Sequence, residues 1–185
     1  MQTYDIRPDL RLRPAATADA DELHLLIDRN RAHLRRWLPW LDGANTPADQ
    51  EVFLTGVVEQ AREGRGGVWI IEETQQISGV CGFNHIDSAN RSAEIGYWLS
   101  ADRQGHGIVT ACVARLLQHA FEDLGLDRLT IPIAIENSRS RAIPERLGFR
   151  HEDTLPQAEW LYDHHVDHAL YTLAHADWRP PDADA

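Results

Sequence analysis

The clearest hydrophobic pattern in the chain lies at residues 108–124. Apolar side chains recur there every three or four residues, at Ile108, Cys112, Val113, Leu116, Leu117, Ala120, Phe121 and Leu124. Polar residues such as Arg115 and Glu122 fill the other side, and Gly125 stands where a glycine commonly follows a helix end. The pattern predicts one long amphipathic helix over 108–124.

The same reasoning predicts three further helices, over residues 17–36, 46–63 and 138–148. Thr17 is the expected cap of the first helix, and Thr46 followed by Pro47 opens the second. Alternating or continuous apolar runs between polar turns predict strands over residues 10–15, 68–73, 77–86, 93–99, 128–136, 149–152 and 168–175. The order β-α-α-β-β-β-α-β-α-β-β indicates a mixed sheet with a parallel crossover through the long helix.

No repeat or linker divides the sequence. We therefore expect one domain over residues 1–178, followed by a frayed tail over residues 179–185.

Two residues interrupt the strands on either side of the long helix. Gly96 lies inside the strand at 93–99, where a bulge is the usual reason, and Pro132 removes a ladder donor from the strand at 128–136. If these strands are neighbours, their ladder is expected to be imperfect. A gap between them would expose peptide groups to a ligand.

The long helix is preceded by Gly105, His106 and Gly107. Glycines allow the backbone to approach another molecule closely, and the free N–H groups of the first helical turn then point at it. Such an entry is typical of a site for an anionic ligand.

Composition narrows the possible partners. The 185 residues carry a formal net charge of −11, which argues against nucleic acid. No basic and then apolar N-terminal segment and no apolar run near 18 residues is found, so we expect no membrane partner and a cytoplasmic location. Cys81 and Cys112 are expected to be buried free thiols in a reducing compartment.

Several segments together resemble one protein family. These segments are "HLRRWLPW", "AEIGYWL", "RQGHGIVTAC", "ENSRSRAIPERLGF" and "QAEWLYDHHVDHALY". Their order is similar to that of the GCN5-related N-acetyltransferases (GNAT), in the ribosomal-protein N-terminal acetyltransferase (RimJ/RimL-like) branch. The glycine loop resembles the family pattern Gln/Arg-x-x-Gly-x-Gly/Ala, with Val109 in the place of its last small residue.

The resemblance implies an α+β GNAT fold. Its mixed central sheet would be splayed between the fourth and fifth strands, here 93–99 and 128–136, with helices on both faces. It also implies that acetyl-CoA is the acyl donor, with its diphosphate at the glycine loop and its pantetheine arm between the splayed strands. The implied cofactor-binding residues are Trp98, Leu99, Gln104, Gly105, His106, Gly107, Ile108, Val109, Thr110 and Asn137.

The resemblance further implies that Glu159 is the catalytic base and that Ser140 donates a proton to the departing thiolate. From the residues alone, apolar neighbours would raise the pKa of Glu159, although an ordinary surface carboxylate is an equal alternative. Ser140 is otherwise a first-turn helix residue, but Pro144 leaves its carbonyl free inside the helix, which favours a functional role. Asn137 is otherwise a helix cap.

Trp37, Leu38 and Trp40 have one interpretation as core side chains. In the other, the two indoles together with Arg35 and Arg36 form the wall of the acceptor cleft. We expect direct transfer in a ternary complex to a protein N-terminal α-amine, with a ribosomal protein as the favoured acceptor. The alternatives are a small amine (aminoglycoside, polyamine or amino acid) and a non-catalytic CoA sensor. A homodimer is expected from the resemblance alone.

The run "DHHVDH" raises the question of a metal. His164 and His168 would be neighbouring ligands on a helix, but the zinc motif H-E-x-x-H is lacking and the flanks look strand-like. We therefore expect no metal, and interpret the run, with His165, as a solvated loop or an interface. Cys112 lies on the apolar stripe of the long helix, which is typical of a small core residue rather than a nucleophile.

Overall fold

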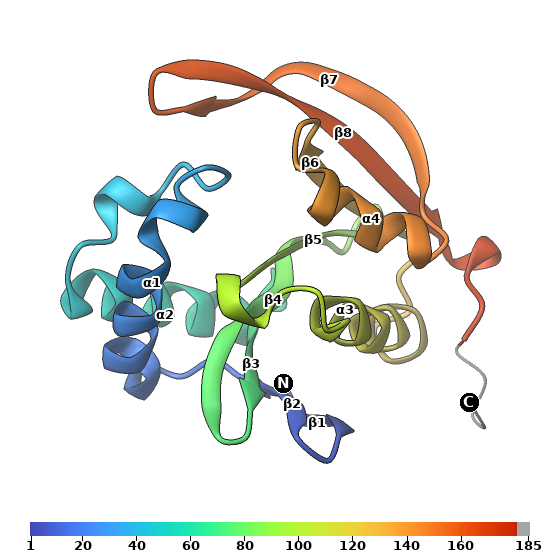
Figure 1. Cartoon of the computed structure of the whole chain (residues 1–185). Coiled ribbons are helices and arrows are strands. Elements are labelled where there is room, and N and C mark those ends of the chain that lie inside the picture. Colours follow the sequence, from blue (N-terminus) through green and yellow to red (C-terminus); the bar gives the residue numbers. More distant parts are fainter. Residues whose placement is uncertain (181–185) are drawn as a thin grey trace.

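The computed structural model describes residues 1–180 and contains one mixed eight-stranded sheet (Figure 1). The strands are β1 (Tyr4–Arg7), β2 (Leu10–Pro14), β3 (Gly67–Glu73), β4 (Gln76–Asp87), β5 (Ser92–Leu99), β6 (Arg128–Ala134), β7 (Arg150–Leu161) and β8 (His164–Ala174). Their order across the sheet is β1-β2-β3-β4-β5-β6-β8-β7. Neighbouring strands are antiparallel except for β5 and β6, which are parallel and joined through the long helix, as the sequence predicts.

Four helices flank the sheet: α1 (Ala20–Leu34), α2 (Pro47–Arg62), α3 (Ile108–Gln118) and α4 (Ser138–Arg146). The sheet has a hydrophobic core on each face, and successive side chains of β3 enter opposite cores because the side chains of a strand alternate between its two faces. Ile70 packs with the buried residues of α1 and α2, whereas Trp69 and Ile71 pack with those of α3. The predicted long helix ends in a π-helical turn at His119–Asp123, and Gly125 follows at φ +63°. No helix of residues 1–180 is long and apolar enough to cross a membrane.

The start of α2 is the one predicted. Thr46 Oγ1 accepts a hydrogen bond from the Asp49 amide at 3.2 Å, and the Asp49 carboxylate accepts one from the Thr46 amide at 2.8 Å. Pro47 occupies the first helical position. These reciprocal bonds satisfy N–H groups that a helix cannot pair internally.

We predict that Thr46→Ala lowers the free energy of unfolding by about 1 kcal/mol, because the cap is lost. Urea denaturation measures this change. Thr55→Ala is the control, since Thr55 lies inside the same helix and its hydroxyl bonds only to the Glu51 carbonyl. Equal destabilisation by both substitutions would contradict the role of the cap.

The structure differs from the sequence predictions at two places near the start of the chain. Thr17 does not cap α1; it begins a 3-10 turn, and the Asp19 carboxylate reaches back to the Ala16 amide at 2.8 Å. Strand β1 is absent from the prediction because four residues are too few to show a period. Of the predicted tail, residues 181–185 lie outside the described residues.

The hairpin of β7 and β8 is much longer than predicted. The run from His164 to His168, interpreted above as a solvated loop or an interface, begins strand β8. The hairpin arches over the molecule toward the segment that follows α1 (Figure 1). At its turn, the Tyr162 hydroxyl donates to the Leu38 carbonyl at 2.5 Å, and the Arg35 guanidinium lies 3.7 Å from the centre of the Tyr162 ring. The hairpin tip is thereby held against the chain between α1 and α2.

Candidate active site

The parallel ladder between β5 and β6 is short. Pairing begins at Ser92 with Arg128 and ends at Glu94 with Thr130, although both strands continue for several residues. Beyond Glu94, β5 is paired only with β4 within the described chain, so its peptide groups on the β6 side lack strand partners. Pro132, which has no N–H, lies on β6 beyond the last pair. The expected parting of these strands is therefore observed.

Gly96 has a different role from the one its position suggests. It pairs with Gly82 in a regular register, and the bulge lies on β4 at Asn84. A Cβ atom on residue 96 would come within 2.4 Å of the Asn84 side chain, which donates to the Glu94 carboxylate at 3.0 Å. The glycine makes room for an amide at the edge of the gap.

The loop before α3 depends on left-handed backbone conformations. Gly105 has φ +85° and Gly107, the residue that caps α3, has φ +70°, both of which favour glycine. A Cβ atom at either residue would meet no atom of residues 1–180 within 4 Å, so both glycines face open space. The first-turn residues of α3, Ile108, Val109 and Thr110, also line a cavity, as an anion site at a helix start requires.

Gln104 is fixed by two contacts in front of this loop. Its side-chain oxygen accepts from the Arg139 guanidinium at 2.6 Å, and its nitrogen lies 2.8 Å from His33 Nε2. Burial, with added repulsion from Arg36 and Arg139, lowers the pKa of His33. A neutral His33 can accept the Gln104 amide hydrogen, which orients the Gln104 oxygen toward Arg139.

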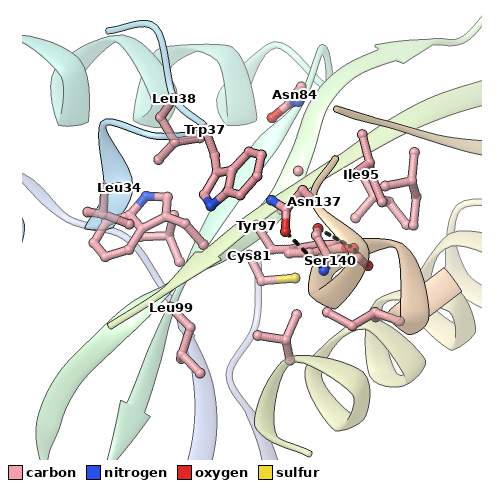
Figure 2. A pocket seen from close by; sticks show the side chains of 18 of the residues that line it. Leu34, Trp37, Leu38, Cys81, Asn84, Ile95, Tyr97, Leu99, Asn137 and Ser140 are labelled. Carbon is pink, nitrogen blue, oxygen red and sulfur yellow. Dashed lines mark hydrogen bonds between the residues drawn. The ribbon is translucent and has the colours of Figure 1, made fainter. Parts of the chain in front are cut away.

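One cavity of about 2140 Å³ brings the predicted residues together. Figure 2 shows part of it, with Trp37 and Leu38 on one side and Asn137 and Ser140 on the other. The predicted residues that line it are Arg36, Trp37, Trp40, Trp98, Leu99, Gln104, Gly105, Gly107, Ile108, Val109, Thr110, Asn137, Ser140 and Glu159. His106, predicted to bind the cofactor, is not among the residues that line the cavity, although both neighbouring glycines are.

Ser140 is held by its own helix and by β5. Its amide donates to Asn137 Oδ1 at 3.2 Å, so Asn137 caps α4. The Ser140 carbonyl, which Pro144 leaves free in the helix, accepts from the Tyr97 hydroxyl at 3.1 Å. The Ser140 hydroxyl lies 3.3 Å from the same Tyr97 oxygen (Figure 2). Asn137 therefore supports Ser140 directly, whatever else it binds.

Sequence reasoning missed Tyr97. Burial raises the pKa of this phenol well above its usual value, so the hydroxyl keeps its proton and remains a donor. The available signal was the alternation in 93–99, which places Tyr97 on the same strand face as Ile95 and Leu99, toward α3 and α4.

We predict that Tyr97→Phe lowers the free energy of unfolding by about 1 kcal/mol, since the half-buried Ser140 carbonyl loses its donor. Turnover should also fall, because the Ser140 hydroxyl loses its neighbour. Urea denaturation and a thiol-release assay measure the two effects. Unchanged stability and turnover would show that this contact does not organise the site.

Glu159 lies on β7 directly after a bulge. Leu155 pairs with His168 and Glu159 pairs with Val166, so β7 advances four residues while β8 advances two. The bulge contains Gln157 at φ +52°, whose amide donates to the Asp167 carboxylate at 2.7 Å. The Glu159 side chain is 30% exposed and lines the cavity. Leu161 is buried but Trp160 is exposed, so the expected apolar surroundings are only partly present.

The aromatic segment after α1 supports the cleft interpretation in part. Arg36, Trp37 and Trp40 all line the cavity, and Trp40 is 39% exposed. Arg35, in contrast, forms a bidentate ion pair with Asp42 and stacks on the Tyr162 ring, so its charge is already paired.

The remaining candidates do not form a site. Within residues 1–180, no group of three or more His, Cys, Asp or Glu side chains is arranged to hold a metal. His164 and His168 are on a strand, where residues four apart are separated by about 13 Å. Cys81 and Cys112 are buried free thiols, as predicted, and burial raises the pKa of Cys112 to about 12.

The comparisons with known proteins agree with this geometry. The acetyltransferase (GNAT) domain model matches residues 9–150. The ribosomal-protein-serine acetyltransferase of Escherichia coli (strain K12) is 31% identical over 170 residues, 92% of this chain and 95% of that protein.

Two solved structures are similar over nearly the whole chain. The microcin C7 self-immunity acetyltransferase MccE, in complex with acetyl-CoA and AMP, has a TM-score of 0.87 and 32% identity, covering 91% of this chain and 94% of that one. RimL, the ribosomal L7/L12 alpha-N-protein acetyltransferase in complex with coenzyme A, has a TM-score of 0.91 and 27% identity, covering 94% of this chain and 98% of that one. The expected fold and the resemblance to the ribosomal-protein branch are confirmed, and the chain belongs to the GNAT family of N-acetyltransferases.

Proposed function

We propose that the protein transfers the acetyl group of acetyl-CoA to the N-terminal α-amine of a ribosomal protein, directly and in a ternary complex. The main support for this proposal is that one and the same cavity is lined by the glycine loop and by the aromatic segment after α1. Direct transfer requires that donor and acceptor occupy neighbouring volumes at once. The similarity to ribosomal-protein acetyltransferases supports this choice of acceptor.

The loop end of the cavity fits the diphosphate of coenzyme A. Open space lies over Gly105 and Gly107, and the first-turn residues of α3 line the cavity beside it, with no side-chain cap within residues 1–180. Arg139 and Arg146 also line the cavity and supply positive charge in a chain of net charge −11, whereas Arg103 on the same wall is paired with Glu73 at 3.1 Å. When bound, acetyl-CoA supplies the acetyl thioester.

The other cavity residues would divide the proton transfers. Glu159 accepts a proton from the acceptor amine, whose unperturbed pKa is about 8, so a modest base suffices. The Ser140 hydroxyl would give a proton to the departing thiolate and regain one from water. Tyr97, 3.3 Å from the Ser140 hydroxyl, keeps that hydroxyl in place.

The acceptor end would receive the chain N-terminus between the aromatic segment and the long hairpin. Trp37 and Trp40 would contact its first residues, and Arg36 would attract a carboxylate further along. A homodimer stays a prediction.

A small amine is the second candidate acceptor. The likeness to MccE at 32% identity, in a structure that also holds AMP, supports a non-protein acceptor. Mass spectrometry separates the candidates: the protein is incubated with acetyl-CoA and a panel of peptides with Ser or Ala N-termini, a ribosomal stalk protein, spermidine and an aminoglycoside. One added acetyl group on peptides or stalk protein alone supports the proposal. A product only from a small amine supports the second candidate, and coenzyme A binding without any product supports a sensor.

A further inference from the structure

The hairpin places a histidine beside the proposed base. Val166 and His168 are two apart on β8, so they share a face, and Glu159 pairs with Val166. Glu159 and His168 are therefore diagonal neighbours on one face of the hairpin. The distance between Glu159 Oε2 and His168 Nε2 is 3.7 Å, and both residues line the cavity.

His168 Nε2 is buried and has no hydrogen-bond partner within residues 1–180. The side chain as a whole is 13% exposed. Buried polar atoms in native proteins are nearly always paired, so an isolated one calls for a role. Its nearest recorded acidic oxygen is that of Glu159, slightly too far for a hydrogen bond. Catalytic hydrogen bonds are often long without substrate and shorten when it binds.

We infer that His168 is a positioning residue: its Nε2–H donates to Glu159 once the acceptor amine engages the other carboxylate oxygen. This inference rests on Glu159 being the base of the proposed function. The bond fixes the carboxylate rotamer and aims its second oxygen at the amine, and no atom is transferred to the histidine. The bulge has a purpose in this arrangement, because its two extra residues bring Glu159 along β8 toward His168.

No charged side chain of residues 1–180 is paired with His168 in the sheet. Its partner on β6 is Ala134 and its partner on β7 is Leu155, neither of which carries a charge. Asp167, next to His168 on β8, is already bonded to the Gln157 amide. The other charged side chains that line the cavity, among them Arg36, Glu136 and Arg139, come from other segments of the chain.

The test is a comparison of His168→Leu and His168→Gln. Gln keeps an N–H donor near the position of the imidazole Nε2, whereas Leu fills the volume without one. We expect His168→Leu to lower kcat roughly 10- to 100-fold, the size of effect that misplaced catalytic groups produce, with the KM for acetyl-CoA unchanged. His168→Gln should recover most of that loss. His164→Leu, an exposed position on the same strand, is the control and should keep wild-type turnover.

A double-mutant cycle separates this inference from the proposed function. In a Glu159→Gln background, His168→Leu should have almost no further effect on kcat, because the group it positions is gone. Additive losses, or equal losses in the Leu and Gln variants, would overturn the inference. If Glu159→Gln alone left turnover unchanged, the assignment of the base would fail instead. Acetyl-CoA binding by calorimetry verifies that each variant is folded.

Discussion

Gly107→Val should abolish measurable binding of coenzyme A. Gly107 holds φ +70°, a conformation that a β-branched residue adopts only at a cost of about 1–2 kcal/mol or more. If the loop relaxes to avoid this strain, the N–H groups of the first turn of α3 turn away from the ligand. If it does not relax, the new side chain projects into the open space where the diphosphate would lie. Either result should lower affinity at least about 100-fold, near 2.7 kcal/mol.

A matched substitution isolates the effect on binding from backbone strain. Gly125, at the other end of the same helical segment, has φ +63° and also faces open space. Gly125→Val should destabilise the fold to a similar extent but leave the affinity for coenzyme A unchanged. Calorimetric titration of both variants measures this contrast. Equal affinity in Gly107→Val and wild type would place the diphosphate elsewhere.

Glu159→Gln should lower turnover roughly 100-fold or more, within the range that a positioned general base contributes. The amide keeps the size of the side chain and its place after the bulge but cannot take a proton from the acceptor. Affinity for acetyl-CoA should not change, because the proposed partner of Glu159 is the acceptor amine, whereas the glycine loop before α3 would hold the diphosphate. Steady-state kinetics and calorimetry together provide the measurement.

Glu152→Gln is the control for a lost carboxylate on the same strand. Glu152 is outside the cavity lining and accepts from Arg128 and Thr172 at 2.5 Å. Its substitution should affect stability slightly and turnover not at all. Wild-type turnover in Glu159→Gln would remove Glu159 as the base, and another cavity residue would have to take that role.

The sequence was sufficient to predict those elements whose structure depends mainly on their own residues. The helix at Thr46 and Pro47 follows from cap chemistry, and α3 follows from an uninterrupted apolar stripe. The parting of β5 and β6 could be anticipated because Pro132 cannot donate to a ladder. The position of Gly96 suggested a bulge in β5. The side chain that requires a glycine there, Asn84, lies instead on the neighbouring strand β4.

Contacts between distant elements could not be read in advance. Tyr97 and Ser140 are 43 residues apart and meet only after α4 packs beside β5. His168 reaches Glu159 only because the hairpin extends past the predicted strand ends, through polar residues that gave no strand signal. The resemblance to the family pointed to Glu159 and Ser140 as candidates, whereas their neighbours Tyr97 and His168 became visible only in the packed structure.

The most direct test of the proposed function uses one peptide that begins with Ser and carries an internal Lys. The peptide is incubated with acetyl-CoA and the protein, and fragment mass spectrometry then locates any added acetyl group. We expect one acetyl group on the N-terminal α-amine, with the lysine unmodified and far less product from Glu159→Gln in the same time. Acetylation of the lysine alone, or equal yield from Glu159→Gln, would contradict it.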